Sequence, residues 1–258
     1  MGKGKRTKLS AAEATEILRE INDYQINKYM KAQKDLLSEL KVQVKCKSQG
    51  QKLLVKTIKE KEVTFVSGMA GTGKTYMACL QALKILKNFA KYEKIIITKS
   101  VTVIPGEDIG YLKGSMQEKM DPFMWSYWTN FEKIIGPSLL QRLREEGYIQ
   151  VWPLAYIRGS NVDKSILLID ESQNISKNTM KTILTRLGKD SRMVFLGDSE
   201  QCDLKNNKDS ALRWYIENFK DFEPFGIVEL TAEDEVRNPL ISKYLEKLEE
   251  IENINKEK

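Results

Sequence analysis

The sequence predicts an α/β protein in which a mostly parallel sheet is flanked by helices, with a helical extension at the N-terminus. Short β-branched runs alternate with helical stretches along most of the chain, which is typical of a parallel sheet. A glycine-rich loop, residues 68–75, joins one of these runs to a helix. A second apolar run, residues 165–169, ends in two acidic residues.

The composition narrows the class of protein. The chain has 258 residues, 41% of them hydrophobic and 30% charged, which suits one α/β domain with modest extensions. No apolar run approaches the roughly 20 residues of a membrane span, and none follows the basic start as in a secretory signal. We therefore expect a cytoplasmic protein without membrane contact, whose three cysteines stay reduced. The lack of histidine excludes Ser-His, Cys-His and His-metal catalysis.

Positive charge is concentrated in the N-terminal part. Residues 1–50 hold eleven Lys and Arg against six Asp and Glu, a net of +5, which leaves only +1 of the total of +6 for the other 208 residues. Such an arm either binds nucleic acid or forms a solvated face. Ser10 and Glu13 form a capping-box pattern that starts a charged helix running toward Leu40. We divide the chain into this arm with its helix, a main domain and a frayed tail, which span residues 1–47, 48–252 and 253–258.

The glycine-rich loop fits G-x-x-x-x-G-K-[ST], the phosphate-binding P-loop. A predicted strand over 63–67 precedes it and a predicted helix over 76–86 follows it, which is the context that the motif requires. Backbone N–H groups and the helix dipole favour phosphate, Lys74 would neutralise the β- and γ-phosphates, and Thr75 would offer its hydroxyl to Mg²⁺. The residues expected to contact ATP here are Gly68, Met69, Ala70, Gly71, Thr72, Gly73, Lys74, Thr75 and Tyr76.

Gln51 stands 23 residues ahead of Lys74 and directly precedes a predicted helix over 52–59. A glutamine shortly before a P-loop strand can read the edge of adenine. A surface glutamine is the alternative, and the spacing does not decide between them.

Polar residues follow the next predicted strand, 94–98. In open α/β sheets the carboxyl ends of the strands face the ligand crevice, so Thr98, Lys99 and Ser100 fall where a nucleic acid backbone can lie. Residues 111–135 hold six large aromatics, which either pack in the core, the commoner role, or stack unpaired bases: Tyr111, Phe123, Trp125, Tyr127, Trp128 and Phe131.

The apolar run over 165–169 ends in Asp170 and Glu171, which is typical of the second nucleotide-binding element of P-loop ATPases. Asp170 is expected to hold Mg²⁺, through water, and Glu171 to polarise the attacking water. A predicted strand over 148–153 comes before this run and leads into a loop that carries Arg158. A predicted helix over 178–187 follows the run, with Arg186 near its end.

Two more strands are predicted, over 192–196 and 227–230. An acid and an amide follow the first of them, and we expect Gln201, supported by Asp198, to sense the γ-phosphate. After the second strand, Asn238 as N-cap and Pro239 at the first helical position mark the start of a closing helix.

Together these segments resemble the PhoH family of P-loop ATPases. The resemblance covers roughly residues 48–248 and includes, in the family's order, GMAGTGKTYMA, Lys99-Ser100 with PGEDIGYLKGSMQEKMDPF, PLAYIRGS, LLIDESQN, LTRLG, GDSEQCDL and EVRNPLI. It implies a single RecA-like core related to superfamily 1 helicases, with ATP and Mg²⁺ as cofactors. The compact form, without an added nuclease domain, looks like the versions that phages carry, which would place it in a host cytoplasm.

The sequence departs from the family pattern at two points. Lys99-Ser100 stands where the family usually has Arg-Pro, and a lysine keeps the charge but lacks the planar fork of arginine. Asn238 stands where the family usually has His, so any role of that imidazole has no carrier here.

The resemblance also implies roles for residues that face the nucleotide. Gln51, Gln201 and Arg237 match helicase positions that serve the adenine and the γ-phosphate. Superfamily 1 helicases take a further arginine from a second lobe, and the sequence ends about twenty residues after Arg237. We therefore expect a neighbouring subunit to complete the site in a closed ring, of six subunits by analogy with single-lobe P-loop motors. Arg158 and Arg186 are the candidates to reach across, unless they form surface salt bridges or hydrolysis is simply slow.

The function expected from the sequence is Mg²⁺-dependent ATP hydrolysis coupled to work on RNA or single-stranded nucleic acid. The alternative is an ATP-dependent switch or assembly protein that moves no strand. A nucleoside kinase is disfavoured by Glu171 beside the expected Mg²⁺ residue and by the Gly-Asp-x-x-Gln element at 197–201.

Overall fold

The computed structural model describes most of the main domain and little of the arm: residues 19, 36–100, 120–199, 201, 210–236, 240, 244 and 247. The chain divides into two units, Met1–Lys41 and Val42–Lys258, and every helix and strand named below belongs to the second. The predicted N-terminal helix, the predicted closing helix, Tyr111 and Arg237 fall largely or wholly outside the described residues. Within the described part of the chain, no helix has the length and apolar character to cross a bilayer.

The centre of the second unit is a six-stranded sheet in the order β3-β2-β4-β5-β1-β6, with every pairing parallel. The strands are β1 (Val63–Gly68), β2 (Lys94–Lys99), β3 (Ile149–Val151), β4 (Ser165–Asp170), β5 (Arg192–Gly197) and β6 (Phe225–Leu230). All residues of β1 and β4 are buried, as expected of parallel strands that are covered on both faces. The prediction of an α/β fold with a parallel sheet is confirmed.

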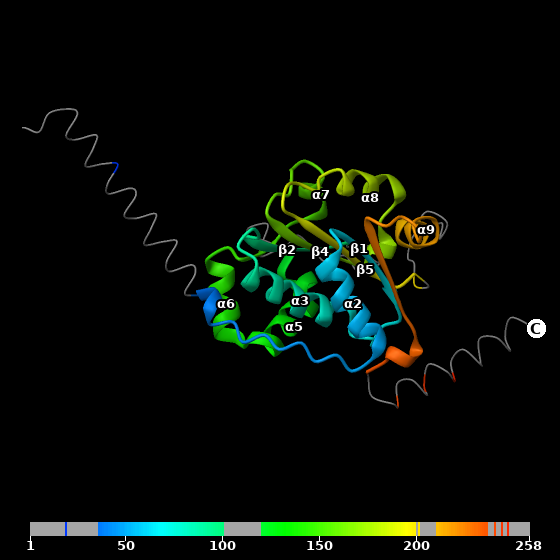
Figure 1. Cartoon of the computed structure of the whole chain (residues 1–258), viewed down its shortest axis with the longest axis horizontal. Coiled ribbons are helices and arrows are strands. Elements are labelled where there is room, and N and C mark those ends of the chain that lie inside the picture. Colours follow the sequence, from blue (N-terminus) through cyan, green and yellow to red (C-terminus); the bar gives the residue numbers. More distant parts are fainter. Residues whose placement is uncertain are drawn as a thin grey trace, which may run out of the picture. The chain divides into compact units, whose positions relative to one another are not determined.

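Helices cover both faces of the sheet. Figure 1 shows α2 (Gln49–Glu60), α3 (Lys74–Asn88) and α5 (Trp125–Ile135) on one side, and α7 (Leu154–Ile157), α8 (Lys177–Leu184) and α9 (Ala211–Asn218) on the other. The remaining helix, α6 (Pro137–Glu145), follows α5 directly. Three short 3-10 helices, η1 (Asp121–Met124), η2 (Ser172–Asn174) and η4 (Ala232–Asp234), complete the described elements.

An aromatic stack forms the core between the sheet and α9. The ring of Phe65 in β1 stacks on Phe195 of β5 and on Tyr215 of α9, with centroids 5.0 and 5.1 Å apart. Met180 and Ile183 of α8 are fully buried in the same cluster. Each large apolar side chain that leaves water here contributes about 1.5–3 kcal/mol to folding.

The start of α2 is fixed by a carboxylate far along the chain. Asp234 accepts the N–H of Gly50 and the N–H of Thr231, each at 3.0 Å, and it also bonds the side chain of Ser48. Ser48 in turn accepts the N–H of Gln51 at 3.1 Å as the helix N-cap, so α2 begins three residues earlier than predicted. Burial acts to raise the pKa of Asp234, but these hydrogen bonds outweigh it and lower the pKa below its usual value.

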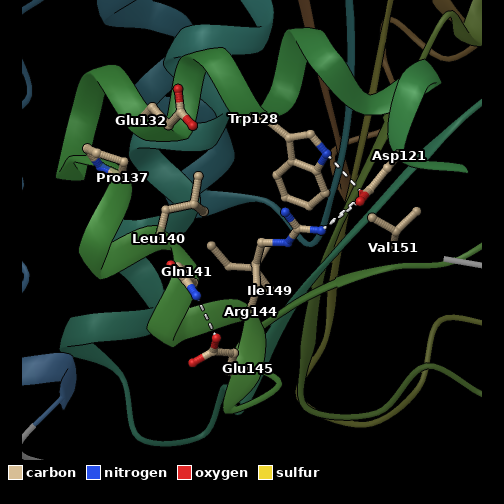
Figure 2. A pocket seen from close by; sticks show the side chains of 10 residues that line it. All are labelled: Asp121, Trp128, Glu132, Pro137, Leu140, Gln141, Arg144, Glu145, Ile149 and Val151. Carbon is tan, nitrogen blue, oxygen red and sulfur yellow. Dashed lines mark hydrogen bonds and ion pairs between the residues drawn. The ribbon is translucent and has the colours of Figure 1, made fainter. Parts of the chain in front are cut away.

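A polar corner joins η1, α5 and α6 beside the edge strand β3. Arg144 donates to both carboxylate oxygens of Asp121, at 3.0 and 3.1 Å, and its guanidinium lies 3.9 Å from the ring centroid of Trp128. Trp128 also donates its Nε1–H to Asp121 at 3.2 Å. Figure 2 shows these groups pointing toward one another at a cavity of about 560 Å³ that Ile149 and Val151 of β3 also line.

The aromatic residues of the 111–135 stretch have divided roles. Tyr127, Trp128 and Phe131 are buried, which confirms the packing interpretation for them. Phe123 is partly buried, whereas Trp125 is 74% exposed at the start of α5. Of the group, only Trp125 stands free to meet a base among the described residues.

Candidate functional site

The glycine-rich loop connects β1 to α3 in a tight turn. Gly71 and Gly73 have φ angles of 99° and 81°, in the left-handed region that a Cβ disfavours. The carbonyl of Gly73, the N-cap of α3, accepts the N–H of Met77 at 2.9 Å. Thr72 is buried, and its hydroxyl donates to the carbonyl of Met69 at 2.9 Å. Glycines and a hydrogen bond within the loop therefore help to set its conformation.

The same loop is suited to an anion. The first turn of α3 contains no acidic residue, so nothing there neutralises the positive end of the helix dipole. Lys74 lies back over the loop, where its ammonium donates to the carbonyl of Met69 at 2.8 Å and to that of Gly68. Loop N–H groups, helix terminus and ammonium thus gather at one place, which fits a triphosphate.

A hydroxyl and a carboxylate meet beside the loop. Thr75 donates its hydroxyl to Asp170 at 3.4 Å. Burial raises the pKa of Asp170 to about 6 and the charge of Glu171 adds to this, while the N–H of Glu171 and the ammonium groups of Lys99 and Lys74 act against it. Two oxygen ligands at the end of a phosphate loop suit Mg²⁺, which keeps waters and substrate phosphates as its other ligands.

Glu171 is held at both carboxylate oxygens. Its Oε1 lies 3.2 Å from the ammonium of Lys99, and its Oε2 accepts the amide N–H of Gln173 at 2.7 Å. The backbone of Glu171 has φ 52° and ψ 39°, a left-handed conformation that costs a non-glycine residue about 1–3 kcal/mol. Strain of this kind persists only where the surroundings fix it, and here they also fix the carboxylate.

Gln173 is a residue of the site that sequence reasoning missed. It is buried, and its Oε1 accepts the backbone N–H of Asp198 at 3.2 Å while its amide nitrogen bonds Glu171. It thereby joins the end of β4 to the end of β5. At Gly197 a Cβ would lie 2.4 Å from this Oε1, so the approach needs glycine. The amide two positions after the acidic pair was the available signal.

A cavity of about 560 Å³ opens over these groups, within the range of ligand pockets. It brings together most of the predicted nucleotide-site residues that the structure describes, namely Ala70, Gly71, Gly73, Lys74, Thr75, Tyr76, Asp170, Glu171 and Gln201, and also Lys99, which was predicted to contact nucleic acid. Asp198 and Gly197 also line it. One wall comes from α5, through Ser126, Asn130 and Lys133, which the sequence did not indicate.

Three predicted residues take other positions. Gln51 is buried against the loop, where its Nε2 donates to the carbonyl of Thr72 at 3.0 Å and its Oε1 accepts the N–H of Lys47 at 2.8 Å. Thr98 is fully buried within β2, so the expectation that it meets a nucleic acid backbone is wrong. Its neighbour Lys99 points to the other face because side chains alternate along a strand. Ser100 donates its hydroxyl to the carbonyl of Asn174 at 3.2 Å.

The two predicted arginines that the structure describes, Arg158 and Arg186, do not line the cavity of their own chain. Arg158 is exposed just after α7. The carbonyl of Arg186 accepts the N–H of Val162 at 3.0 Å, and Val162 lies three residues ahead of β4. Arg186 therefore lies near the amino-terminal end of β4, whereas the cavity lies at its carboxyl end. The amino-terminal end of β4 lies about 17 Å from Asp170 along the strand. Arg237 is outside the described residues, and Val236 before it donates its N–H to the carbonyl of Gly71 at 3.1 Å.

The sequence matches a protein family model and is similar to several bacterial proteins. A family model described as PhoH-like protein matches residues 43–249. The chain is 38% identical over 203 residues to the PhoH-like protein of Bacillus subtilis, across 79% of this chain and 63% of that protein. It is 34% identical over 201 residues to Protein PhoH of Escherichia coli K12, across 77% of this chain and 56% of that protein. The chain thus spans about 60% of the length of the curated relatives that it matches.

Solved structures with a similar arrangement are more distant. The large terminase of a thermophilic bacteriophage, in complex with ADP, aligns with a TM-score of 0.47 and 11% identity, over 76% of this chain and 49% of that one. The UvsW helicase of bacteriophage T4 aligns with a TM-score of 0.44 and 12% identity, over 78% of this chain and 67% of that one.

Proposed function

This chain belongs to the PhoH-like protein family, and on that premise we propose that it is an Mg²⁺-dependent ATPase that couples hydrolysis to remodelling of RNA or single-stranded nucleic acid. One observation carries the hydrolytic half. The hydroxyl of Thr75 lies 3.4 Å from Asp170 at the end of a phosphate loop, and Glu171 follows directly, so two oxygens that would bind the cation and a carboxylate that would polarise water line one cavity.

The protein's part in the reaction is to position and to stabilise charge. Mg²⁺-ATP, when bound, supplies the transferable phosphoryl group and the Lewis acid. The loop N–H groups and Lys74 would bind the phosphates, and Thr75 with Asp170 would hold the cation. Glu171 would orient the attacking water as its hydrogen-bond acceptor. Gln201, exposed at the rim of the cavity, would sense the γ-phosphate.

The nucleic-acid half has its support beside the same cavity. Lys99 lines it and is partly exposed, and Ser100 follows where β2 ends. Strands of this kind present their carboxyl ends to the ligand. The basic arm, residues 1–47, would add a sequence-independent attraction for phosphates. We place this activity in the cytoplasm.

We also propose that the working form is a closed homo-oligomeric ring, taken as six subunits. Neither Arg158 nor Arg186 lines the cavity of its own chain, so each would act only on a neighbour. The exposed Arg158 is the better placed of the two, because Arg186 has a buried Nε within the fold.

The test is ATP hydrolysis with and without Mg²⁺, single-stranded RNA and single-stranded DNA. We expect Glu171→Gln to lower turnover by about 100-fold or more while ATP still binds, since the substitution removes the acceptor and keeps the shape. Lys74→Ala should abolish both ATP binding and ATP hydrolysis. Lys84→Ala, on an exposed face of α3, is the matched control. Hydrolysis that depends on Glu171 and ignores both strands would instead support the ATP-dependent switch or assembly protein.

A further inference from the structure

Lys99 forms an ion pair with the carboxylate that hydrolysis needs. It is the last residue of β2, paired in register with Asp170 of β4, and its ammonium lies 3.2 Å from Oε1 of Glu171. The side chain of Lys99 is 25% exposed and that of Glu171 38% exposed, so solvent and solutes reach both. With Gln173 on Oε2, both oxygens of Glu171 already have a donor from the protein.

Such a carboxylate is poorly available to water. A residue that orients the attacking water must accept its hydrogen bond in the right direction, and geometry is the first requirement for a general base. An ammonium competes for the same lone pairs and holds the side chain toward β2. Gln173 is anchored by the N–H of Asp198, the residue that follows β5, whereas Lys99 has a flexible four-carbon stem. Of the two partners, Lys99 is therefore the one that can leave.

The cavity offers an anion a place to meet Lys99. Ser126, Asn130 and Lys133 recur along one side of α5 and line the cavity together with Lys99. A hydroxyl, an amide and an ammonium are the groups that contact phosphate oxygens in nucleic acid complexes. A phosphodiester bound there would be a new partner for the ammonium of Lys99. The site lies at the carboxyl ends of the strands, where open α/β sheets bind their ligands.

We propose that Lys99 is a positioning residue that restrains Glu171 in the resting protein and releases it when a phosphodiester of single-stranded nucleic acid binds the lysine. Strand binding would thereby be coupled to hydrolysis through one side chain. The inference rests on the proposed ATPase function and extends it to regulation of that site.

The experiment measures kcat and KM for ATP in Lys99→Met, with and without single-stranded RNA and DNA. We expect the strand-free kcat to rise by about two- to fivefold, the scale of one partly exposed ion pair, with KM unchanged and no further stimulation by either strand. Lys99→Arg keeps the charge and should retain the restrained rate and the stimulation. Lys94→Met is the matched control, since Lys94 begins the same strand and lies over Trp152 instead.

The outcomes separate this inference from the function beneath it. If the wild type hydrolyses ATP in a manner sensitive to Glu171→Gln, yet Lys99→Met has the same or a lower strand-free kcat, the restraint does not exist. A raised KM in Lys99→Met would assign the lysine to the phosphates of ATP and also overturn the inference. If neither protein hydrolyses ATP above the Glu171→Gln background, the ATPase proposal itself fails. Lys99→Gln replaces Lys99→Met should the latter not fold.

Discussion

Single side chains in this site are positioned by partners that are themselves held. Gln173 contacts Glu171 through its amide nitrogen and the backbone of Asp198 through its oxygen. These two bonds link Glu171 to the residue that follows β5, so we expect an effect of Gln173 on catalysis to pass through Glu171. A buried amide with both ends satisfied has one orientation, so the carboxylate beside it inherits that orientation.

We therefore expect Gln173→Ala to lower kcat by about ten- to a hundredfold with the dissociation constant for ATP unchanged, because Glu171 loses its support while the phosphate loop stays intact. Steady-state kinetics and calorimetry measure the two quantities. Gln150→Ala is the control, since that amide bonds Gly147 and Trp152 away from the cavity. An unchanged kcat would mean that Glu171 needs no support from β5.

Gln51 offers a second test at the scale of single residues. Its side chain either supports the glycine-rich loop or recognises the adenine of ATP. Its amide nitrogen bonds the carbonyl of Thr72, and that acceptor would be left buried in Gln51→Ala. We expect a loss of about 1–3 kcal/mol in the free energy of unfolding and an equal weakening of ATP and GTP binding. Thermal melts and calorimetry with both nucleotides check this, with the exposed Gln141→Ala as control. A selective loss for ATP would favour adenine reading.

The sequence predicted the residues whose chemistry is written in a local motif. The phosphate loop, Asp170 and Glu171 were found because the loop and the acidic strand end are contiguous patterns, and the structure gathers them in one cavity. Gln173 and the α5 wall depend on tertiary packing and left only a weak local signal. Thr98 was wrong because a strand end was taken as a set, although neighbouring side chains point to opposite faces.

At the scale of elements, η4 secures the start of α2. Asp234 accepts hydrogen bonds from Gly50, Thr231 and Ser48, although it is 184 residues from Gly50 along the chain. No local pattern predicts this contact, which is why the predicted helix began three residues late. The predicted strands and the predicted helices that follow the glycine-rich loop and β4 lie within a few residues of those in the structure, whereas no helix was predicted at α6, α7 or α9.

We expect Asp234→Asn to lower the free energy of unfolding by about 1–3 kcal/mol at pH 7, because an amide turns a donor toward backbone N–H groups that need an acceptor. The folded pKa of Asp234 lies below its usual value of about 3.9, so its contribution is fully present above that pH. The contribution is lost as pH falls through the folded pKa. The free energies of unfolding of the two proteins, measured from pH 7 downward, should therefore draw closer once the pH falls below about 3.9. The exposed Asp221→Asn should show no such difference at any pH.

For the whole molecule, the strand order decides which side chains meet. Because β5 lies between β1 and β4, the ends of four strands line up as phosphate loop, Asp198, Glu171 and Lys99. The sequence predicted a parallel sheet and polar strand ends, but neither the order nor the register of Lys99 with Asp170. The contacts between neighbouring strand ends could therefore be learned only from the structure. The division of the chain at residue 47 stays a prediction.

The proposed closed ring leads to a prediction about Arg158, which would act on the site of a neighbouring subunit. An arginine supplied by a neighbour is worth about 10³–10⁵ in turnover. Arg158→Ala should therefore reduce hydrolysis to near background while ATP binding and the ring itself persist. Light scattering gives the mass of the assembly, and Arg213→Ala, another exposed arginine that pairs with Glu217 in its own helix, is the control.

Mixing two inactive variants tests whether the arginine acts between subunits. Arg158→Ala subunits keep Glu171, and Glu171→Gln subunits keep Arg158, so an interface between the right pair has both groups. Random assembly from equal amounts gives that pair at about a quarter of the interfaces, and we expect about a quarter of the wild-type rate to return. If the mixture stays inactive, Arg158 is not the shared group, and Arg186→Ala takes its place in the same mixture. A monomeric wild type with full activity would contradict the ring itself, because a lone chain brings neither arginine to its own cavity.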